Sequence, residues 1–322
     1  MKKSLLALAA LTAFTGAVSA QSNVTMYGRI DLAVGKAVGT DQKAISNGSG
    51  SRLGLRGSED LGGGMAAIFN IEHRFNADTG VSGEGNPLAA TTAARFWGGR
   101  SLVGLKGNFG QLTLGREYTT AFLGSQLIID PWGWDTIAAS TGTAGITGLG
   151  IARVRNDSAV TYNFAGGGFS FGAQIAEGTD TINNFQKRPV NFSAGYAAGP
   201  VALNMGYELT GFEAAAKEKI LSLGGSFDMG VVKLGAGYMK GTTAADVSRK
   251  GYLLTAVAPM GQGELRAAIG RRTVGGTDDI NLVVVGYHYA LSKRTTVYVD
   301  VANNSKLATE KSAYDFGLKH NF

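Results

Sequence analysis

The sequence predicts an all-β protein, a transmembrane antiparallel β-barrel with sixteen strands. Three observations lead to this fold class. Apolar and polar residues alternate along many segments, these segments are about ten residues long, and short turns alternate with longer polar connections. The chain also has 49 glycines and 5 prolines in 322 residues, with a mean hydropathy of +0.04. This composition favours many strands with tight turns over a bundle of membrane helices.

The alternation is clearest in residues 201–210, which read VALNMGYELT. Every second residue from Val201 to Leu209 is apolar, whereas most of the residues between them are small or polar. Similar patterns begin at Val24 and Phe169. One face of each segment can therefore lie against an apolar medium while the other face lies against water.

Period-two alternation also occurs in soluble β-sandwiches, so it leaves sandwich and barrel open. The segment length favours a barrel, because a tilted strand needs about 9 to 11 residues to cross the hydrocarbon of a bilayer. Short turns are expected at residues 108–110, 198–200, 259–263 and 291–294, between longer polar connections. Short turns on one rim and long loops on the other are typical of outer-membrane barrels.

Sixteen candidate strands lie between Val24 and Phe322. An even number places both chain ends on the periplasmic rim. We expect the last strand to pair with the first, because hydrocarbon cannot solvate an open sheet edge. Aromatic residues near strand ends are expected to form interfacial belts on the outer surface. They are Trp97, Phe164, Tyr196, Tyr252 and Phe322.

The first twenty residues have the three parts of an export signal. Lys2 and Lys3 are basic, residues 5–14 are mostly apolar, and Ala-Val-Ser-Ala ends at residue 20. We therefore expect residues 1–20 to be removed and residues 21–322 to form one barrel domain. The apolar run is too short for a transmembrane helix, which needs about 20 residues, and no other apolar segment is longer.

Composition argues against several other functions. The chain has no cysteine, so it has neither a thiol nucleophile nor a disulfide. Without the signal it has 28 basic and 24 acidic residues, a formal charge of +4, and the basic residues are too dispersed for nucleic-acid binding. His73, His288 and His320 lack metal-ligand spacing, and no nucleophile elbow is present. The sequence predicts no catalytic residue, metal site or cofactor.

One long segment interrupts the alternation. Residues 118–152 are rich in Gly, Thr and Ala, and they form the third long connection, between candidate strands five and six. A connection of this length in a compact domain is usually functional or disordered. We expect order in the Asp-Pro-Trp-Gly-Trp-Asp stretch at residues 130–135 and flexibility in residues 142–150.

Four motifs resemble the general porins of the Gram-negative porin family, of the neisserial and comamonad type. They are SRLGLRGSEDLGGGMAAIFNIE at residues 51–72, RSLVGLKGNFGQLTLGRE at 100–117, RNDSAVTYNF at 155–164 and GLKHNF at 317–322. The resemblance covers nearly the whole chain after the signal. It implies a homotrimer of sixteen-stranded barrels, each with its long third loop folded into the lumen to form a constriction.

The resemblance also implies which residues line that constriction. In these motifs Arg52, Arg100 and Arg155 match arginines of the anion-selective members, and Glu72 matches a glutamate. The alternation agrees with inward positions for these four residues, because the apolar residues of their strands take the alternate, lipid-facing positions. An arginine turned toward lipid at the midplane would cost about 2 to 4 kcal/mol. The alternative for each arginine is that it pairs with a loop carboxylate and braces the wall.

Five further residues are weaker candidates for the pore lining. Alternation places Arg29, Arg56 and Arg74 on the inner face. Asp130 and Asp135 lie in the long connection and could supply carboxylates opposite the arginines. Their segment departs from the acidic Pro-Glu-Phe-Gly motif of the enteric porins.

Arg116 is a different case. It shares its face with Leu112 and Leu114, so it points to lipid unless Gly115 begins a bulge or the strand has already ended. It is therefore retained only as a weaker pore-lining candidate.

The resulting hypothesis is a passive diffusion channel for ions and small hydrophilic solutes in the outer membrane of a Gram-negative bacterium. Wall arginines opposite loop carboxylates would create a field with a weak to moderate preference for anions. The expected partners are outer-membrane lipid, passing solutes and ions, and further copies of the chain. One alternative is a substrate-specific channel with an aromatic ladder or a dedicated lumenal site. The other is an outer-membrane barrel enzyme with a catalytic group on its rim.

Overall fold

The computed structural model describes residues 23–82, 95–135, 137, 146–177 and 187–322. In this part of the chain, seventeen strands form one sheet of antiparallel pairs, with two short helical turns on the connection after β6. The predicted export signal lies outside the described residues and stays a prediction. The strands and helical turns are β1 (Asn23–Lys36), β2 (Lys43–Asn47), β3 (Arg52–Gly62), β4 (Met65–Arg74), β5 (Arg100–Gly107), β6 (Gly110–Tyr118), η1 (Phe122–Gln126), α2 (Leu127–Ile129), β7 (Arg155–Gly166), β8 (Phe169–Ala176), β9 (Val190–Ala198), β10 (Val201–Glu213), β11 (Lys217–Asp228), β12 (Lys233–Thr242), β13 (Ser248–Met260), β14 (Gly263–Val274), β15 (Thr277–Ala290), β16 (Thr295–Asn304) and β17 (Ser312–Asn321).

Two of these strands share one position in the sheet. Residues 32–36 of β1 pair with β2, and residues 23–29 of the same strand pair with β3. β2 and β3 are therefore two halves of one interrupted barrel strand. The barrel has sixteen strand positions, which confirms the predicted number.

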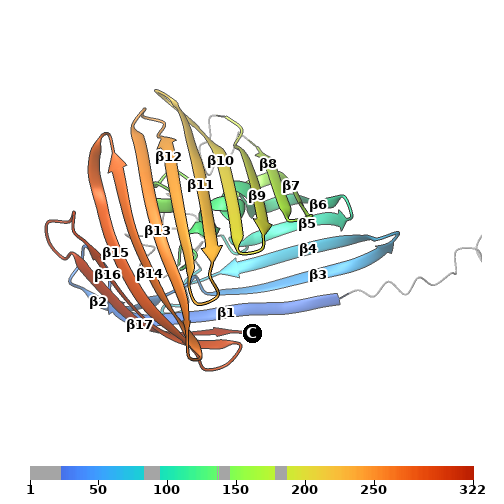
Figure 1. Ribbon diagram of the computed structural model, residues 1–322. Helices are drawn as coiled ribbons and strands as arrows, with labels where there is room; N and C mark the ends of the chain where they lie inside the picture. Colours follow the sequence, from blue (N-terminus) through green and yellow to red (C-terminus); the bar gives the residue numbers. More distant parts are fainter. Residues whose placement is uncertain (1–22, 83–94, 136, 138–145, 178–186) are drawn as a thin grey trace, which may run out of the picture.

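The sheet closes on itself between the two ends of the chain (Figure 1). β1 pairs with β17 from Arg29 opposite Asn321 to Lys36 opposite Tyr314. Beyond this ladder, Gly28 and Phe322 exchange two main-chain hydrogen bonds, with N···O distances of 2.9 and 3.1 Å. Closure leaves no open edge, as hydrocarbon surroundings require.

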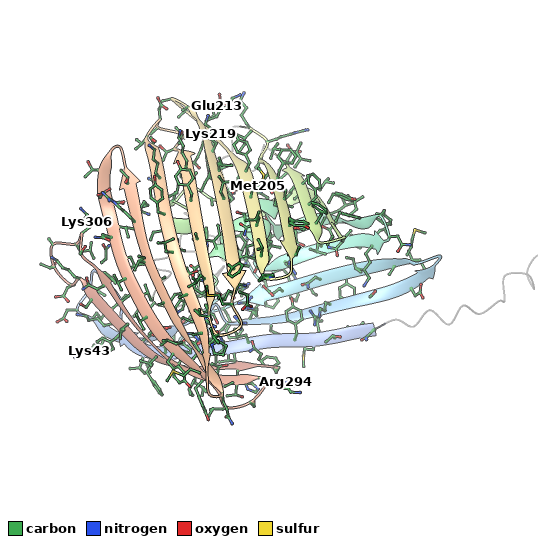
Figure 2. The ribbon with its side chains drawn as sticks, in the orientation of Figure 1. Lys43, Met205, Glu213, Lys219, Arg294 and Lys306 are labelled. Carbon is green, nitrogen blue, oxygen red and sulfur yellow. The ribbon has the colours of Figure 1, made fainter. Side chains whose placement is uncertain are left out.

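Side chains on the strands alternate between an exposed apolar face and a covered inner face. On β10, Leu203 and Met205 are 56% and 44% exposed, whereas Glu208 is fully buried. Figure 2 shows Met205 along the length of β10, between charged residues at the two rims. The outer surface is thus an apolar band between polar rims, the arrangement that a bilayer selects. The five aromatic residues expected in the interfacial belts are all exposed: Trp97, Phe164, Tyr196, Tyr252 and Phe322.

The connections differ between the two rims, as predicted. The expected short turns lie between β5 and β6, β9 and β10, β13 and β14, and β15 and β16. The longest connections, residues 75–99 and 119–154, lie at the opposite ends of their strands. None of the helices in the described residues is both long enough and apolar enough to span a membrane.

The third long connection joins β6 to β7, which are the fifth and sixth strand positions, as expected. Its described residues lie against the inner face of the barrel. Ile129 is buried beside Gly224 of β11 and Gly237 of β12. A Cβ atom at either glycine would lie 2.4 or 2.5 Å from an Ile129 carbon, so these two positions admit only glycine while Ile129 stays in place.

The glycine-rich end of this connection differs from expectation. Flexibility was predicted for residues 142–150, of which 142–145 lie outside the described residues. In the described remainder, Ile146 and Leu149 are fully buried, and the Leu149 carbonyl accepts a hydrogen bond from Arg249 at 2.7 Å. The prediction was wrong for this part, because the two apolar side chains pack against the inner face of β13 and β14.

Candidate functional site

Three arginines lie side by side on the inner wall, on neighbouring strands. The register pairs Arg29 of β1 with Arg52 of β3, and Arg52 with Arg74 of β4. Like charges on opposed residues destabilise a sheet, so these side chains need compensating partners. Arg29 donates to Asn321 Oδ1 at 2.8 Å and to Ser49 Oγ at 3.0 Å. These acceptors are neutral, so they hold the guanidinium without cancelling its charge.

Glu72 of β4 is a buried carboxylate among these arginines, with 4% exposure. Its Oε1 accepts a hydrogen bond from Arg74 Nε at 2.6 Å, and its Oε2 accepts one from the Tyr27 hydroxyl at 3.1 Å. Register places Glu72 opposite Arg100 of β5. Hydrogen bonds between charged groups are the strong ones, so Glu72 fixes the position of Arg74.

Arg100 and Arg155 extend the set toward the end of β6. Arg100 Nε donates to Glu117 Oε1 at 2.8 Å, and Arg155 Nη2 donates to the Tyr118 hydroxyl at 2.6 Å. The Cζ atoms of these two arginines lie over the Tyr118 ring, 4.8 and 4.2 Å from its centroid. The structure therefore gathers the arginines and Glu72 assigned by the resemblance on one wall. We call the following five side chains the arginine row: Arg29, Arg52, Arg74, Arg100 and Arg155.

The two aspartates of the long connection have different surroundings. Asp135 faces the arginine row, with Oδ2 3.9 Å from Arg52 Nη2. Removal from water raises the pKa of the Asp135 carboxyl, against the opposing pull of Arg52 and Arg74. Asp130 Oδ1 accepts a hydrogen bond from the backbone N–H of Trp132 at 2.9 Å, so it stabilises the turn that carries this tryptophan.

Arg56 lies apart from the arginine row. Its guanidinium covers the ring of Tyr27, with Cζ 5.1 Å from the centroid. Together with Arg100 and Lys106 it lines an open cavity of about 440 Å³ on the inner wall. Lys106 was not among the residues predicted from the sequence, although alternation places it on this face.

Arg116 is held in a separate ion pair. The bulge that the sequence left open is present: Gly115 has φ +126°, and the register between β6 and β7 shifts after it. Arg116 Nη1 lies 2.6 Å from Asp157 Oδ1, and its Nε donates to the Gly98 carbonyl at 2.9 Å. Arg95 pairs with the same Asp157. These contacts cover Arg116 with the connection before β5.

Besides Lys106, sequence reasoning missed Glu117 and Tyr118. Glu117 is 5% exposed and pairs with Arg100. A signal for it existed, because alternation along β6 places Glu117 on the inner face. Tyr118 carries no such signal, because it is the last residue of its strand and was counted with the long connection.

A closed antiparallel barrel with an apolar outer surface and a charged inner wall is the architecture of a pore-forming outer-membrane protein. The chain belongs to the Gram-negative porin family, whose sequence profile matches residues 7–308. It is an outer-membrane channel for small solutes, and it is not an enzyme.

Similar proteins share both the sequence and the fold. The chain is 30% identical over 404 residues to an outer membrane porin protein of Bordetella pertussis, with full coverage of both chains. The anion-selective porin from Comamonas acidovorans has a TM-score of 0.77 at 26% identity, covering 94% of this chain and 100% of that one. The trimer form of OmpT from Vibrio cholerae has a TM-score of 0.70 at 15% identity, covering 94% and 99%, which supports the fold.

Proposed function

We propose that the channel is a general diffusion pore with a weak to moderate preference for anions, and that the arginine row sets this preference. The observation that carries the proposal is the imbalance of charge on this wall. Five guanidinium groups and the Lys319 ammonium face four carboxylates, those of Asp31, Glu72, Glu117 and Asp135. The remaining positive charge attracts small anions and repels small cations.

The size of this effect suits a fast channel. In water-like surroundings a unit charge at 4 Å contributes about 1 kcal/mol, so a few uncompensated charges favour anions without trapping them. Asp135 belongs to the long connection and faces Arg52 of the wall, so the field runs across the channel between loop and wall. We infer that this part of the connection narrows the passage and forms the constriction. The anion-selective porin of Comamonas acidovorans, which is similar in fold and sequence, supports the assignment.

We also infer that the chain assembles as a homotrimer in the outer membrane. The Vibrio cholerae porin of the same fold has been solved as a trimer, which supports this inference. Light scattering of the detergent-purified protein, with the detergent contribution subtracted, measures the protein mass directly. A mass of one or two chains would contradict the assembly.

The test of selectivity is the reversal potential of a planar bilayer containing the channel, measured in a potassium chloride gradient at neutral pH. We expect the sign of the reversal potential to indicate a preference for chloride over potassium. Arg155→Gln should lower the chloride over potassium permeability ratio, because it removes one charge of the arginine row. Arg294→Gln is the matched control, since Arg294 is an exposed residue in the turn at the far rim (Figure 2). Cation preference in the wild-type channel would contradict the proposal.

A substrate-specific channel is the alternative that this measurement leaves open. Liposome swelling with sugars of increasing size separates the two functions. A general pore should show rates that fall smoothly with solute size, with no chemical preference between sugars of equal size. A single sugar that enters faster than smaller ones would support a specific channel instead.

A further inference from the structure

Tyr118 lies at the centre of the arginine row. Its hydroxyl oxygen accepts hydrogen bonds from Arg74 Nη2 at 2.5 Å and from Arg155 Nη2 at 2.6 Å. Its ring lies beneath the guanidinium groups of Arg100 and Arg155. One side chain thus contacts three of the five arginines, which come from three different strands.

We propose that Tyr118 is the positioning residue of the channel's selectivity: it holds the arginines of this wall together while leaving their charge in place. This inference rests on the proposed function of the arginine row. A carboxylate at this position would also bind the guanidinium groups, but it would cancel one positive charge. A phenol accepts the same hydrogen bonds and offers its ring face to cations without any formal charge.

Arg155 depends most strongly on this contact. It is 5% exposed, and in the described part of the chain its side chain donates only to the Tyr118 hydroxyl. Its Nε is buried without a hydrogen-bond partner among those residues. A buried guanidinium requires hydrogen bonds and a compensating partner, so removal of the phenol oxygen would leave Arg155 next to Arg74 with no acceptor.

Tyr118 is itself held firmly. Register places it directly opposite Arg155 in the β6–β7 ladder. Its ring stacks on Phe122 of η1, with centroids 5.5 Å apart and an angle of 12° between the planes. Its backbone N–H donates to Glu117 Oε1 at 2.7 Å, the same oxygen that binds Arg100. The end of a barrel strand and the start of the long connection therefore fix the phenol from two sides.

The experiment replaces Tyr118 by phenylalanine, which removes the hydroxyl but keeps the ring and changes no formal charge. We expect the chloride over potassium permeability ratio to fall at least about twofold, since one unit charge at contact distance in water-like surroundings changes local ion concentration about fivefold. Tyr162→Phe is the matched control, because the Tyr162 hydroxyl donates to the Phe109 carbonyl, in the short turn between β5 and β6. It should leave the ratio unchanged.

A second comparison separates positioning from general loss of structure. If Tyr118 acts through Arg155, then Arg155→Gln should lower the ratio in the wild-type background and have little further effect in the Tyr118→Phe background. Equal effects of Arg155→Gln in both backgrounds would overturn the inference, as would a wild-type ratio in Tyr118→Phe. If Tyr118→Phe does not insert, Arg155→Lys tests the contact from its other side. Lysine keeps the charge but cannot use both the ring and the hydroxyl, so a wild-type ratio would overturn the inference.

These outcomes differ from failure of the proposed function. If Arg155→Gln leaves selectivity unchanged, the role of the arginine row itself is refuted. If Arg155→Gln alters the ratio while Tyr118→Phe does not, the row sets selectivity and only the role of Tyr118 is refuted.

Discussion

Trp132 of the long connection donates its indole N–H to Asp300 of β16, with 2.9 Å between Nε1 and Oδ1. Both side chains are buried, at 4% and 0% exposure. His288 Nε2 lies 3.1 Å from the same Asp300 oxygen, and the carbonyl of Pro131 accepts a hydrogen bond from Arg266 at 2.8 Å. The connection is thus attached to β14 and β16, which lie beyond β17 from β1, the strand that carries Arg29 of the arginine row.

This attachment predicts the effect of Trp132→Phe. The variant keeps an aromatic ring but removes the donor, and a hydrogen bond to a charged group contributes about 1.5 to 3 kcal/mol. We expect the connection to detach part of the time, which should appear as larger current fluctuations in the open channel. Single-channel recording at constant voltage measures this. Trp97→Phe is the control, because Trp97 lies on the exposed outer surface. Equal noise in the two variants would refute the attachment.

The close approach of Ile129 to the wall predicts that Gly237→Val destabilises the folded protein. A Cβ at residue 237 would lie 2.5 Å from Ile129 Cγ2, and overpacking of this kind costs about 1 to 3 kcal/mol. The variant should lose its folded form in unheated gels at a lower temperature than wild type. Ala236→Val adds similar bulk on the neighbouring exposed residue and should show no comparable loss. A wild-type midpoint for Gly237→Val would mean that Ile129 moves aside without cost.

The raised pKa of Asp135 predicts how selectivity changes with pH. A raised pKa means that this carboxyl takes up its proton at a higher pH than an ordinary aspartate. Protonation removes a negative charge opposite Arg52, so the chloride preference should grow as the pH falls toward the ordinary aspartate range. Asp135→Asn should show the larger preference already at neutral pH and a weaker response to acid. Reversal potentials between neutral and acidic pH test this, and an identical response in the variant would contradict the role of Asp135.

A substitution at Glu117 should change the chloride over potassium permeability ratio in the opposite direction to the arginine variants. Its carboxylate pairs with Arg100 at 2.8 Å, so Glu117→Gln removes a negative charge from the wall while keeping a side chain of the same shape. We expect a higher chloride over potassium permeability ratio than in wild type. Glu59→Gln removes an equal charge from an exposed residue of β3 and should leave the ratio unchanged. A lower ratio in Glu117→Gln would show that loss of the Arg100 contact outweighs the change in charge.

Most of the barrel was predictable because the membrane requires an apolar outer face on each strand, and this requirement acts between neighbouring residues. A residue such as Leu203 must point to lipid and its neighbour must not, so alternation within ten residues reveals the strand and its faces. The same parity placed Arg52, Arg74 and Glu72 on the inner face before any contact was known. The interruption between β2 and β3 escaped the prediction, because both halves pair with the one continuous strand β1.

The sequence by itself determined the membrane class, the number of strand positions, the closure between the chain ends and the faces of the principal arginines. Only the tertiary structure revealed how these arginines are held. Tyr118 meets Arg74 and Arg155, Asp135 meets Arg52, and Trp132 meets Asp300, each across strands or loops distant in the chain. The physical reason is the distance along the chain over which each requirement acts. The membrane enforces alternation at every residue, so it can be read within one strand. A hydrogen bond across the lumen depends on where the closed sheet and the long connection bring two distant side chains together.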